Sequence, residues 1–148
     1  LYQRYRFDEP WDGPNNSQLL PLMPQVFRCP THGQPGDTVT AFAGVFGPNS
    51  VFRGTNGTSF ADITDGASNT LSVAEVTTGA RIPWMKPEDV DITIHSMLGD
   101  PAGFGSHHVG GFNALMLDGS VRFISTSISP TILQGLYTID GNEQIQDF

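Results

Sequence analysis

The sequence predicts an α+β fold: a mainly antiparallel sheet with short helices and long Gly/Pro-rich loops. Two observations support this prediction. Several short stretches are rich in β-branched and aromatic residues and are separated by turn-forming residues. Glycine (17) and proline (11) are frequent, which favours short strands joined by many turns. With 148 residues, the chain has the length of one domain, and we expect residues 1–148 to form it.

The stretch from 105 to 124 carries the strongest structural signal. Asp118-Gly119 lies between two apolar runs, a pattern typical of a two-residue hairpin turn with positive φ at both central residues. It predicts antiparallel strands at about Phe112–Leu117 and Ser120–Ile124. A two-residue turn fixes the register, and the residues expected to face the core are then Ala114, Met116, Val121 and Phe123.

Three elements are expected before the hairpin. Asn15 or Asn16 can cap a short helix that ends near Met23. Residues 38–46 have the alternating, β-branched and aromatic character of a strand. Residues 71–76 form a second predicted strand, with Glu75 placed late in it.

Residues 77–103 are the least regular part, with one short strand or turn expected within 90–98. After the hairpin, Ser129-Pro130 is typical of a helix start, because proline is favoured at the first helical position. An apolar stripe continues this predicted helix through Ile132, Leu133, Leu136 and Tyr137.

The charge balance excludes some classes of function. The chain has fifteen Asp and Glu residues and seven Lys and Arg residues, which gives a net charge of −8. With no basic stripe, the chain is not expected to bind nucleic acid, and anionic membrane surfaces would repel it. The sequence has no signal peptide and no apolar run of transmembrane length.

The residues show no motif that predicts an enzyme. There is no Gly-x-Ser-x-Gly elbow, phosphate-binding loop or His-Glu-x-x-His helix, and Ser106-His107-His108 is only an adjacency. Cys29 and His32 have a spacing seen in metal sites, but two ligands do not make a site. We therefore expect Cys29, the single cysteine, to be a buried or lone thiol.

Carboxylates in Gly/Asn-rich loops give a calcium hypothesis, since Ca²⁺ prefers oxygen ligands. The candidate metal ligands are Asp62, Asp65, Asp100 and Asp118, with Glu75 as a further oxygen donor. No EF-hand spacing is present. The alternative for residues 62–70 is a structural loop, because their side chains can bond nearby backbone groups.

Two motifs and one segment resemble a known family. His108, nine residues and then Asp118-Gly119 resemble the His-X9-Asp-Gly motif of the prepilin-type processing-associated domain, in a bacterial family of unknown function (DUF1559). Residues 62–70 resemble its second signature, which includes Asp65, Gly66, Ser68 and Asn69. Residues 82–89 resemble its Pro-Trp segment, and the likeness runs over about 1–146.

The resemblance implies a pilin-like globular head without its N-terminal helix: an exported, extracytoplasmic, non-enzymatic subunit of the cell envelope or cell surface. Its expected setting is a type II secretion or type IV pilus-like assembly, with other pilin-like subunits or envelope proteins as partners. The membrane is expected to be reached only through an N-terminal helix absent from these residues. We expect the isolated, acidic head to be monomeric or weakly self-associating.

Some alternatives stay open. The rival function is an extracytoplasmic module that binds carbohydrate or another small ligand through Trp11, Trp84 and the acidic loops. The resemblance adds an analogy for calcium, because some type II secretion pseudopilins hold Ca²⁺ in a C-terminal loop. It also implies that Cys29 can be half of a disulfide in a longer protein. For His108, a structural role is weighed against metal binding and against processing or partner recognition.

Overall fold

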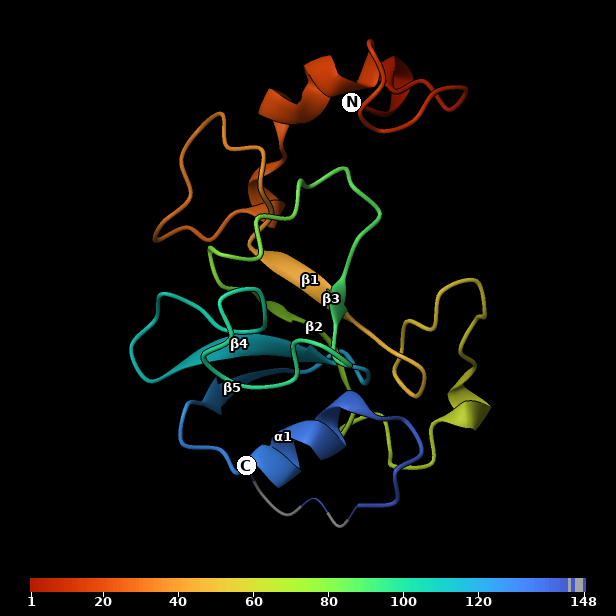
Figure 1. Ribbon diagram of the computed structural model, residues 1–148, viewed down its shortest axis with the longest axis vertical. Helices are drawn as coiled ribbons and strands as arrows, with labels where there is room; N and C mark the ends of the chain where they lie inside the picture. Colours follow the sequence, from red (N-terminus) through yellow and green to blue (C-terminus); the bar gives the residue numbers. More distant parts are fainter. Residues whose placement is uncertain (144, 146–147) are drawn as a thin grey trace.

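The computed structural model describes residues 1–143, 145 and 148, and within them the fold is built on one five-stranded sheet (Figure 1). The strand order is β3-β1-β2-β4-β5. The strands are β1 (Phe42–Phe46), β2 (Leu71–Glu75), β3 (Val90–Asp91), β4 (Gly111–Met116) and β5 (Val121–Ser125). Only β1 and β3 run parallel, and the other neighbours are antiparallel. The predicted α+β fold with a mainly antiparallel sheet is confirmed.

Helices are short throughout the described residues. One α-helix, α1 (Pro130–Tyr137), follows the hairpin, and four 3-10 helices lie earlier in the chain, namely η1 (Tyr2–Arg4), η2 (Asn16–Leu22), η3 (Gln25–Phe27) and η4 (Phe60–Asp62). The N-terminal segment and α1 lie at opposite ends of the molecule (Figure 1). No helix in the described part of the chain is long and apolar enough to cross a membrane.

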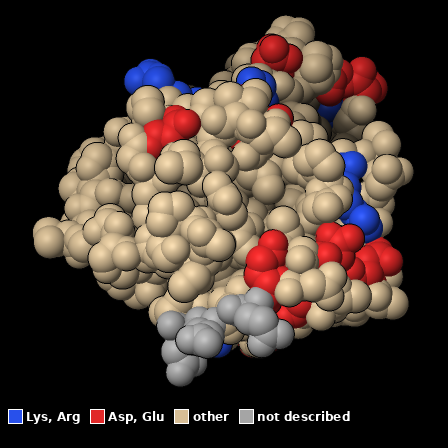
Figure 2. All heavy atoms as spheres, turned by 60° about the horizontal axis from the view of Figure 1, so that its bottom comes forward, with Lys and Arg blue, Asp and Glu red and all other residues tan. Residues whose placement is uncertain are grey.

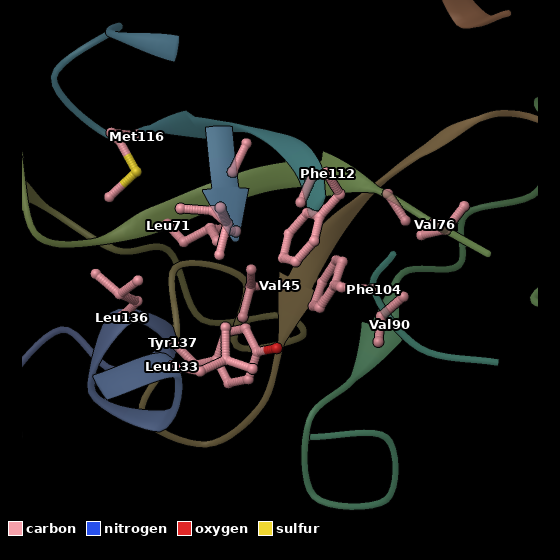
Figure 3. Packing of buried hydrophobic residues seen from close by; sticks show 14 of the residues in the cluster. Val45, Leu71, Val76, Val90, Phe104, Phe112, Met116, Leu133, Leu136 and Tyr137 are labelled. Atoms are coloured by element: carbon pink, nitrogen blue, oxygen red, sulfur yellow. The ribbon is translucent and has the colours of Figure 1, made fainter. Parts of the chain in front are cut away.

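The hydrophobic core lies between the sheet and α1. Leu133, Leu136 and Tyr137 of α1 are buried and point toward the strand residues Val45 and Leu71 (Figure 3). The predicted stripe accounts for this face, and Pro130 stands at the helix start as expected. Burial raises the pKa of the Tyr137 hydroxyl, because the charged form would lose its hydration.

Two predicted elements differ in detail. The helix expected to end near Met23 is the 3-10 helix η2, with Pro21 inside it. Proline has no N–H to donate and its ring disfavours a regular α-helix, which explains the short 3-10 form. The strand expected from residue 38 begins only at Phe42, and the Thr40 hydroxyl bonds to the Phe42 N–H and C=O just before it.

The β4–β5 hairpin is confirmed, but its predicted turn and register are wrong. The Met116 N–H donates to Ser120 O at 2.8 Å, and the Gly119 N–H donates to Met116 O at 3.0 Å, so the loop has three residues. Of these, Gly119 has a φ of +86°, whereas Asp118 is not among the residues with positive φ. This is the type I turn followed by a left-handed residue that is common in three-residue hairpins.

The third loop residue shifts the register by one, so each β5 side chain points to the side of the sheet opposite to the one predicted. The pairs are Leu115 with Val121 and Asn113 with Phe123, instead of the expected partners. Ile124 is therefore buried, while Val121 is 68% exposed and Phe123 is 51% exposed. Leu115 beside them is 38% exposed, so the face of the hairpin away from the core carries an unpredicted apolar strip, defined as Leu115, Val121 and Phe123.

Charged side chains cover little of the face shown in Figure 2. Asp and Glu atoms gather toward one side of that face, and most of it is uncharged. Lys and Arg form no continuous patch there, in keeping with seven such residues in 148.

Candidate functional site

Three side chains from distant parts of the chain converge beside β2. Glu75 ends β2, Cys29 follows η3, and His108 lies in the loop before β4. His108 Nε2 lies 3.7 Å from Cys29 Sγ and 3.2 Å from Glu75 Oε1. One ligand-type atom from each residue lies within 4.8 Å of the other two. We call these residues the Cys-Glu-His cluster.

The carboxylate of Glu75 is buried and held in a fixed orientation. Glu75 is 3% exposed, and its Oε2 accepts hydrogen bonds from the Asn113 N–H at 2.6 Å and from Asn113 Nδ2 at 3.2 Å. These bonds engage one carboxylate oxygen and leave Oε1 facing His108. A buried carboxylate needs such partners, because it has lost its hydration.

Local hydrogen bonds hold the loop that carries His108. The Gly105 N–H donates to Glu75 O at 3.0 Å, which attaches the start of the loop to the end of β2. The Ser106 hydroxyl donates to Gly111 O at 2.7 Å and accepts from the His108 N–H at 3.0 Å. The serine thus closes the loop and sets the position of His108 above Glu75.

Cys29 is positioned by the turn around it. The N–H groups of His32 and Gly33 both donate to Cys29 O, at 3.3 and 2.7 Å. Just before it, Phe27 O accepts the Ala41 N–H at 2.8 Å, and the Phe27 ring stacks on Trp84 at 5.8 Å. These contacts connect the N-terminal segment to the sheet next to Glu75. Cys29 is a free thiol.

A pocket of about 440 Å³ adjoins the cluster. Cys29 and Glu75 line it together with Ser106, His32 and His107. The last two rings lie against each other with centroids 4.1 Å apart. The pocket therefore gives solvent-borne groups a path to two of the three cluster residues.

The geometry distinguishes two kinds of chemistry. A nucleophile–histidine–carboxylate relay uses both ring nitrogens, one toward the nucleophile and one toward the carboxylate. Here the same atom, His108 Nε2, faces both Cys29 Sγ and Glu75 Oε1. The arrangement therefore lacks the geometry of such a relay, and three donor atoms instead surround one point.

A sequence model of a protein family described as "Protein of unknown function (DUF1559)" matches residues 31–90 and 85–131. The matched region covers more than half of the chain and agrees with the family suspected from the motifs. The chain belongs to DUF1559. No curated protein and no solved structure matches it. Membership in DUF1559 gives the chain a family but no activity.

In this DUF1559 chain, the residues of the His-X9-Asp-Gly pattern are not brought together. His108 joins the cluster, whereas Asp118 and Gly119 lie at the far end of β4, in the hairpin turn. The rise of about 3.4 Å per residue along a strand puts the two ends of β4 roughly 17 Å apart. Asp118 accepts from the Ser120 N–H and hydroxyl, which lowers the pKa of its carboxyl.

The loop of residues 62–70 forms a hydrogen-bonded junction. The Asp65 carboxylate accepts the N–H groups of Gly141 and Asn142 at 2.7 and 2.8 Å. Within this loop, Gly66 has a φ of +90°, and Asn69 Nδ2 donates to Asp65 O. Ser68 lies in the turn of the same loop. These bonds agree with the structural alternative for residues 62–70.

The same loop contacts the hairpin turn. The Asp118 N–H donates to Ala67 O at 3.1 Å, and the Leu117 N–H donates to Thr70 O at 2.9 Å. The Thr64 N–H, in turn, donates to Ile139 O at 2.8 Å. The hairpin turn, the loop of residues 62–70 and the segment after α1 are therefore joined by backbone hydrogen bonds.

The four aspartates of the calcium hypothesis bond separate partners. Asp62 pairs with Arg53 at 3.0 Å and accepts the Ser59 N–H, while Asp100 pairs with His95 at 2.9 Å. Hydrogen bonds lower the pKa of both carboxyls, from the Ser59 N–H and then Arg53 for Asp62, and from the Ala102 N–H and then His95 for Asp100. In the described parts of the chain, Cys-Glu-His is the one convergent group of three His, Cys, Asp or Glu, and it contains none of the four aspartates. Calcium binding stays a prediction.

Sequence reasoning missed the cluster because its members are far apart in the chain, with 79 positions between Cys29 and His108. It paired Cys29 with His32, which lines the pocket but is not among the three convergent residues. One usable signal was Glu75, a carboxylate placed late in an apolar strand. Such a residue requires a partner, although the sequence does not say which one.

Proposed function

We propose that this DUF1559 chain is a non-enzymatic structural or interaction subunit, the pseudopilin-like head of an envelope assembly. The assembly is of the type II secretion or type IV pilus kind, and the chain acts in it as an exported, extracytoplasmic protein. Membership in DUF1559 supports the family part of this proposal. The observation that carries the interaction role is the apolar strip of the β4–β5 hairpin.

The strip is suited to contact with another protein. Leu115 and Val121 are direct cross-strand neighbours, and Phe123 follows on the same face of β5. Strand β5 is also the last strand of the sheet, so its outer edge has no strand neighbour among the described residues. Fully burying a Val, Leu or Phe side chain contributes about 1.5–3 kcal/mol, which makes such a strip a favourable contact surface.

The net negative charge of the chain favours binding to a specific partner over non-specific self-association. The chain carries a net charge of −8, so identical heads repel one another at low ionic strength. A pilin-like subunit that covers the strip with an apolar surface overcomes this repulsion locally. Partners of this kind, rather than nucleic acid or a bare anionic membrane, fit the composition.

The pocket beside the cluster favours the second candidate, a module that binds carbohydrate or another small ligand. Its size of about 440 Å³ suits a small molecule. Neither of the two tryptophans expected to serve this role, Trp11 and Trp84, lines the pocket. The Trp84 Nε1–H donates to Leu20 O at 2.9 Å, and its ring stacks on Phe27. The second candidate therefore rests on the pocket and not on a tryptophan platform.

Photo-crosslinking in the cells that make the protein tests the assembly role. Benzoylphenylalanine replaces Phe123 in the full-length protein, and the adducts are identified by mass spectrometry in each cell fraction. We expect adducts in the envelope fraction that contain a pilin-like subunit. The matched control carries the same probe at Phe60, which is 75% exposed on η4 and does not belong to the strip.

Three results contradict the assembly proposal: no adduct at Phe123, equal adducts at Phe123 and Phe60, or adducts confined to cytoplasmic proteins. Saturable binding to defined sugars on a glycan array, lost when His32 or His107 is replaced by alanine, supports the small-ligand module instead. Both rings line the pocket and neither belongs to the strip, so the two candidates are separated.

A further inference from the structure

We infer that Cys29, Glu75 and His108 form a zinc-binding site. The inference does not depend on the proposed assembly role, because none of the three residues belongs to the apolar strip. It rests on the distances between the three donor atoms, on the types of donor, and on the burial of Glu75.

Two of the three distances between the donor atoms match the edges of a tetrahedron around zinc, and the third, between Cys29 Sγ and a Glu75 carboxylate oxygen, is at most 4.8 Å. Zn–S bonds of about 2.3 Å and Zn–N or Zn–O bonds of about 2.0–2.1 Å, at tetrahedral angles, separate S from N by about 3.6 Å and N from O by about 3.3 Å. The cluster has 3.7 Å between Cys29 Sγ and His108 Nε2, and 3.2 Å between His108 Nε2 and Glu75 Oε1. These two distances need little change when the ion binds.

The donor set selects the kind of metal. A thiolate, an imidazole nitrogen and a carboxylate oxygen form a mixed S, N, O set that suits Zn²⁺. Calcium and magnesium bind oxygen ligands and do not favour sulfur or imidazole. The metal expected at this cluster therefore differs from the calcium expected from the aspartate loops.

The buried carboxylate is the second argument. Glu75 is 3% exposed, and in the described part of the chain its ion-pair partner is His108, with no Lys or Arg paired to it. A cation at the centre of the cluster compensates the charge of Glu75 more fully than one imidazole does. Asn113 holds the other carboxylate oxygen and so orients Glu75 toward that centre, as outer partners of metal ligands do.

A fourth ligand would come from the pocket. Three protein ligands with one further position are typical of zinc sites that exchange a water or another small ligand. Cys29 and Glu75 both line the pocket, which also contains the rings of His32 and His107. The fourth position is therefore reached from the pocket, and we expect water or another small ligand to fill it.

Cobalt titration of the purified 148-residue chain in a reducing buffer tests the site, because Co²⁺ substitutes for zinc and reports its ligands. We expect one Co²⁺ per chain, with the near-ultraviolet charge-transfer band of a thiolate ligand and the visible bands of tetrahedral cobalt. Added Zn²⁺ should remove these bands stoichiometrically. An equal excess of Ca²⁺ should leave them unchanged.

Variants identify the ligands. C29S should abolish the charge-transfer band, and H108N and E75Q should each weaken cobalt binding by at least about tenfold. The matched control is H95N, since His95 also pairs with a carboxylate, that of Asp100, but belongs to no three-residue cluster. H95N should bind cobalt like the unmodified chain.

Asn113 provides a graded test of the outer partner. N113A removes the Nδ2 bond to Glu75 but keeps the backbone N–H, and should weaken metal binding by about tenfold without changing the number of ions bound. Circular dichroism confirms that each variant is folded.

Three results overturn the inference. The first is the absence of a charge-transfer band in the folded, unmodified chain, a result that can be interpreted without any variant. The second is a band that survives C29S, or cobalt affinity that H108N and E75Q leave intact. The third is loss of binding in H95N equal to that in H108N, or displacement of cobalt by Ca²⁺.

Discussion

Gly119 allows a sharp test of the conformation of the hairpin turn. Glycine is needed there because of its positive φ, and not because a larger side chain would clash with neighbouring atoms. Its φ is +86°, and a Cβ added there would meet no heavy atom within 4 Å. A left-handed conformation costs an ordinary L-residue about 1–2 kcal/mol, so G119A should destabilise the fold by that amount. For a chain of this length this corresponds to a fall in melting temperature of about 3–8 °C.

The size of the effect should follow the side chain. G119N should cost less than G119A, because asparagine tolerates the left-handed region better than alanine does. G119V should cost more, since a β-branched residue resists positive φ. Thermal and urea unfolding, followed by circular dichroism, measure the series.

Gly57 gives the matched control. A Cβ there also meets nothing within 4 Å, but its φ lies outside the left-handed region. G57A should therefore leave the melting temperature unchanged or raise it slightly. Equal losses in G57A and G119A, or G119N as damaging as G119V, would refute the reasoning.

Two further predictions concern the core and the response to acid. L136A removes a fully buried side chain of α1 and should lower the free energy of unfolding by about 2–5 kcal/mol in urea titrations, whereas L22A, at an exposed position, should have little effect. Hydrogen bonds from the Ala102 N–H and then from His95 lower the pKa of Asp100 below its ordinary 3.8. This stabilisation is complete above about pH 4 and is lost as the pH falls through the lower folded pKa. D100N should therefore flatten the dependence of stability on pH in the acid range, and an unchanged acid profile would contradict the assignment.

The elements of the sheet and α1 could be predicted, because each has a local signal. The apolar stripe predicted after Ser129-Pro130 lies on α1, and the strand predicted at residues 71–76 corresponds to β2. The register of the hairpin could not be predicted, since Asp-Gly occurs in both two-residue and three-residue loops. The single added loop residue, Leu117, exposed Val121 and Phe123 and buried Ile124.

The Cys-Glu-His cluster could not be predicted from the sequence. Its formation depends on the N-terminal turn reaching across the sheet to β2, which is a tertiary contact with no local pattern. The motif containing His108 directed attention to Asp118, at the opposite end of β4, instead of to Cys29 and Glu75. A sequence motif therefore marked one residue of the cluster without identifying its partners.

The junction between the hairpin turn and the loop of residues 62–70 also has a consequence for local unfolding. The bonds from Leu117 and Asp118 to Thr70 and Ala67 run between backbones, as does the bond from Thr64 to Ile139. These hydrogen bonds link the hairpin turn, the loop of residues 62–70 and the segment after α1. When one of these segments opens, it breaks bonds that also hold the others. We expect these three regions to open as one cooperative unit, so that a disturbance in one increases solvent exchange at amides in the other two.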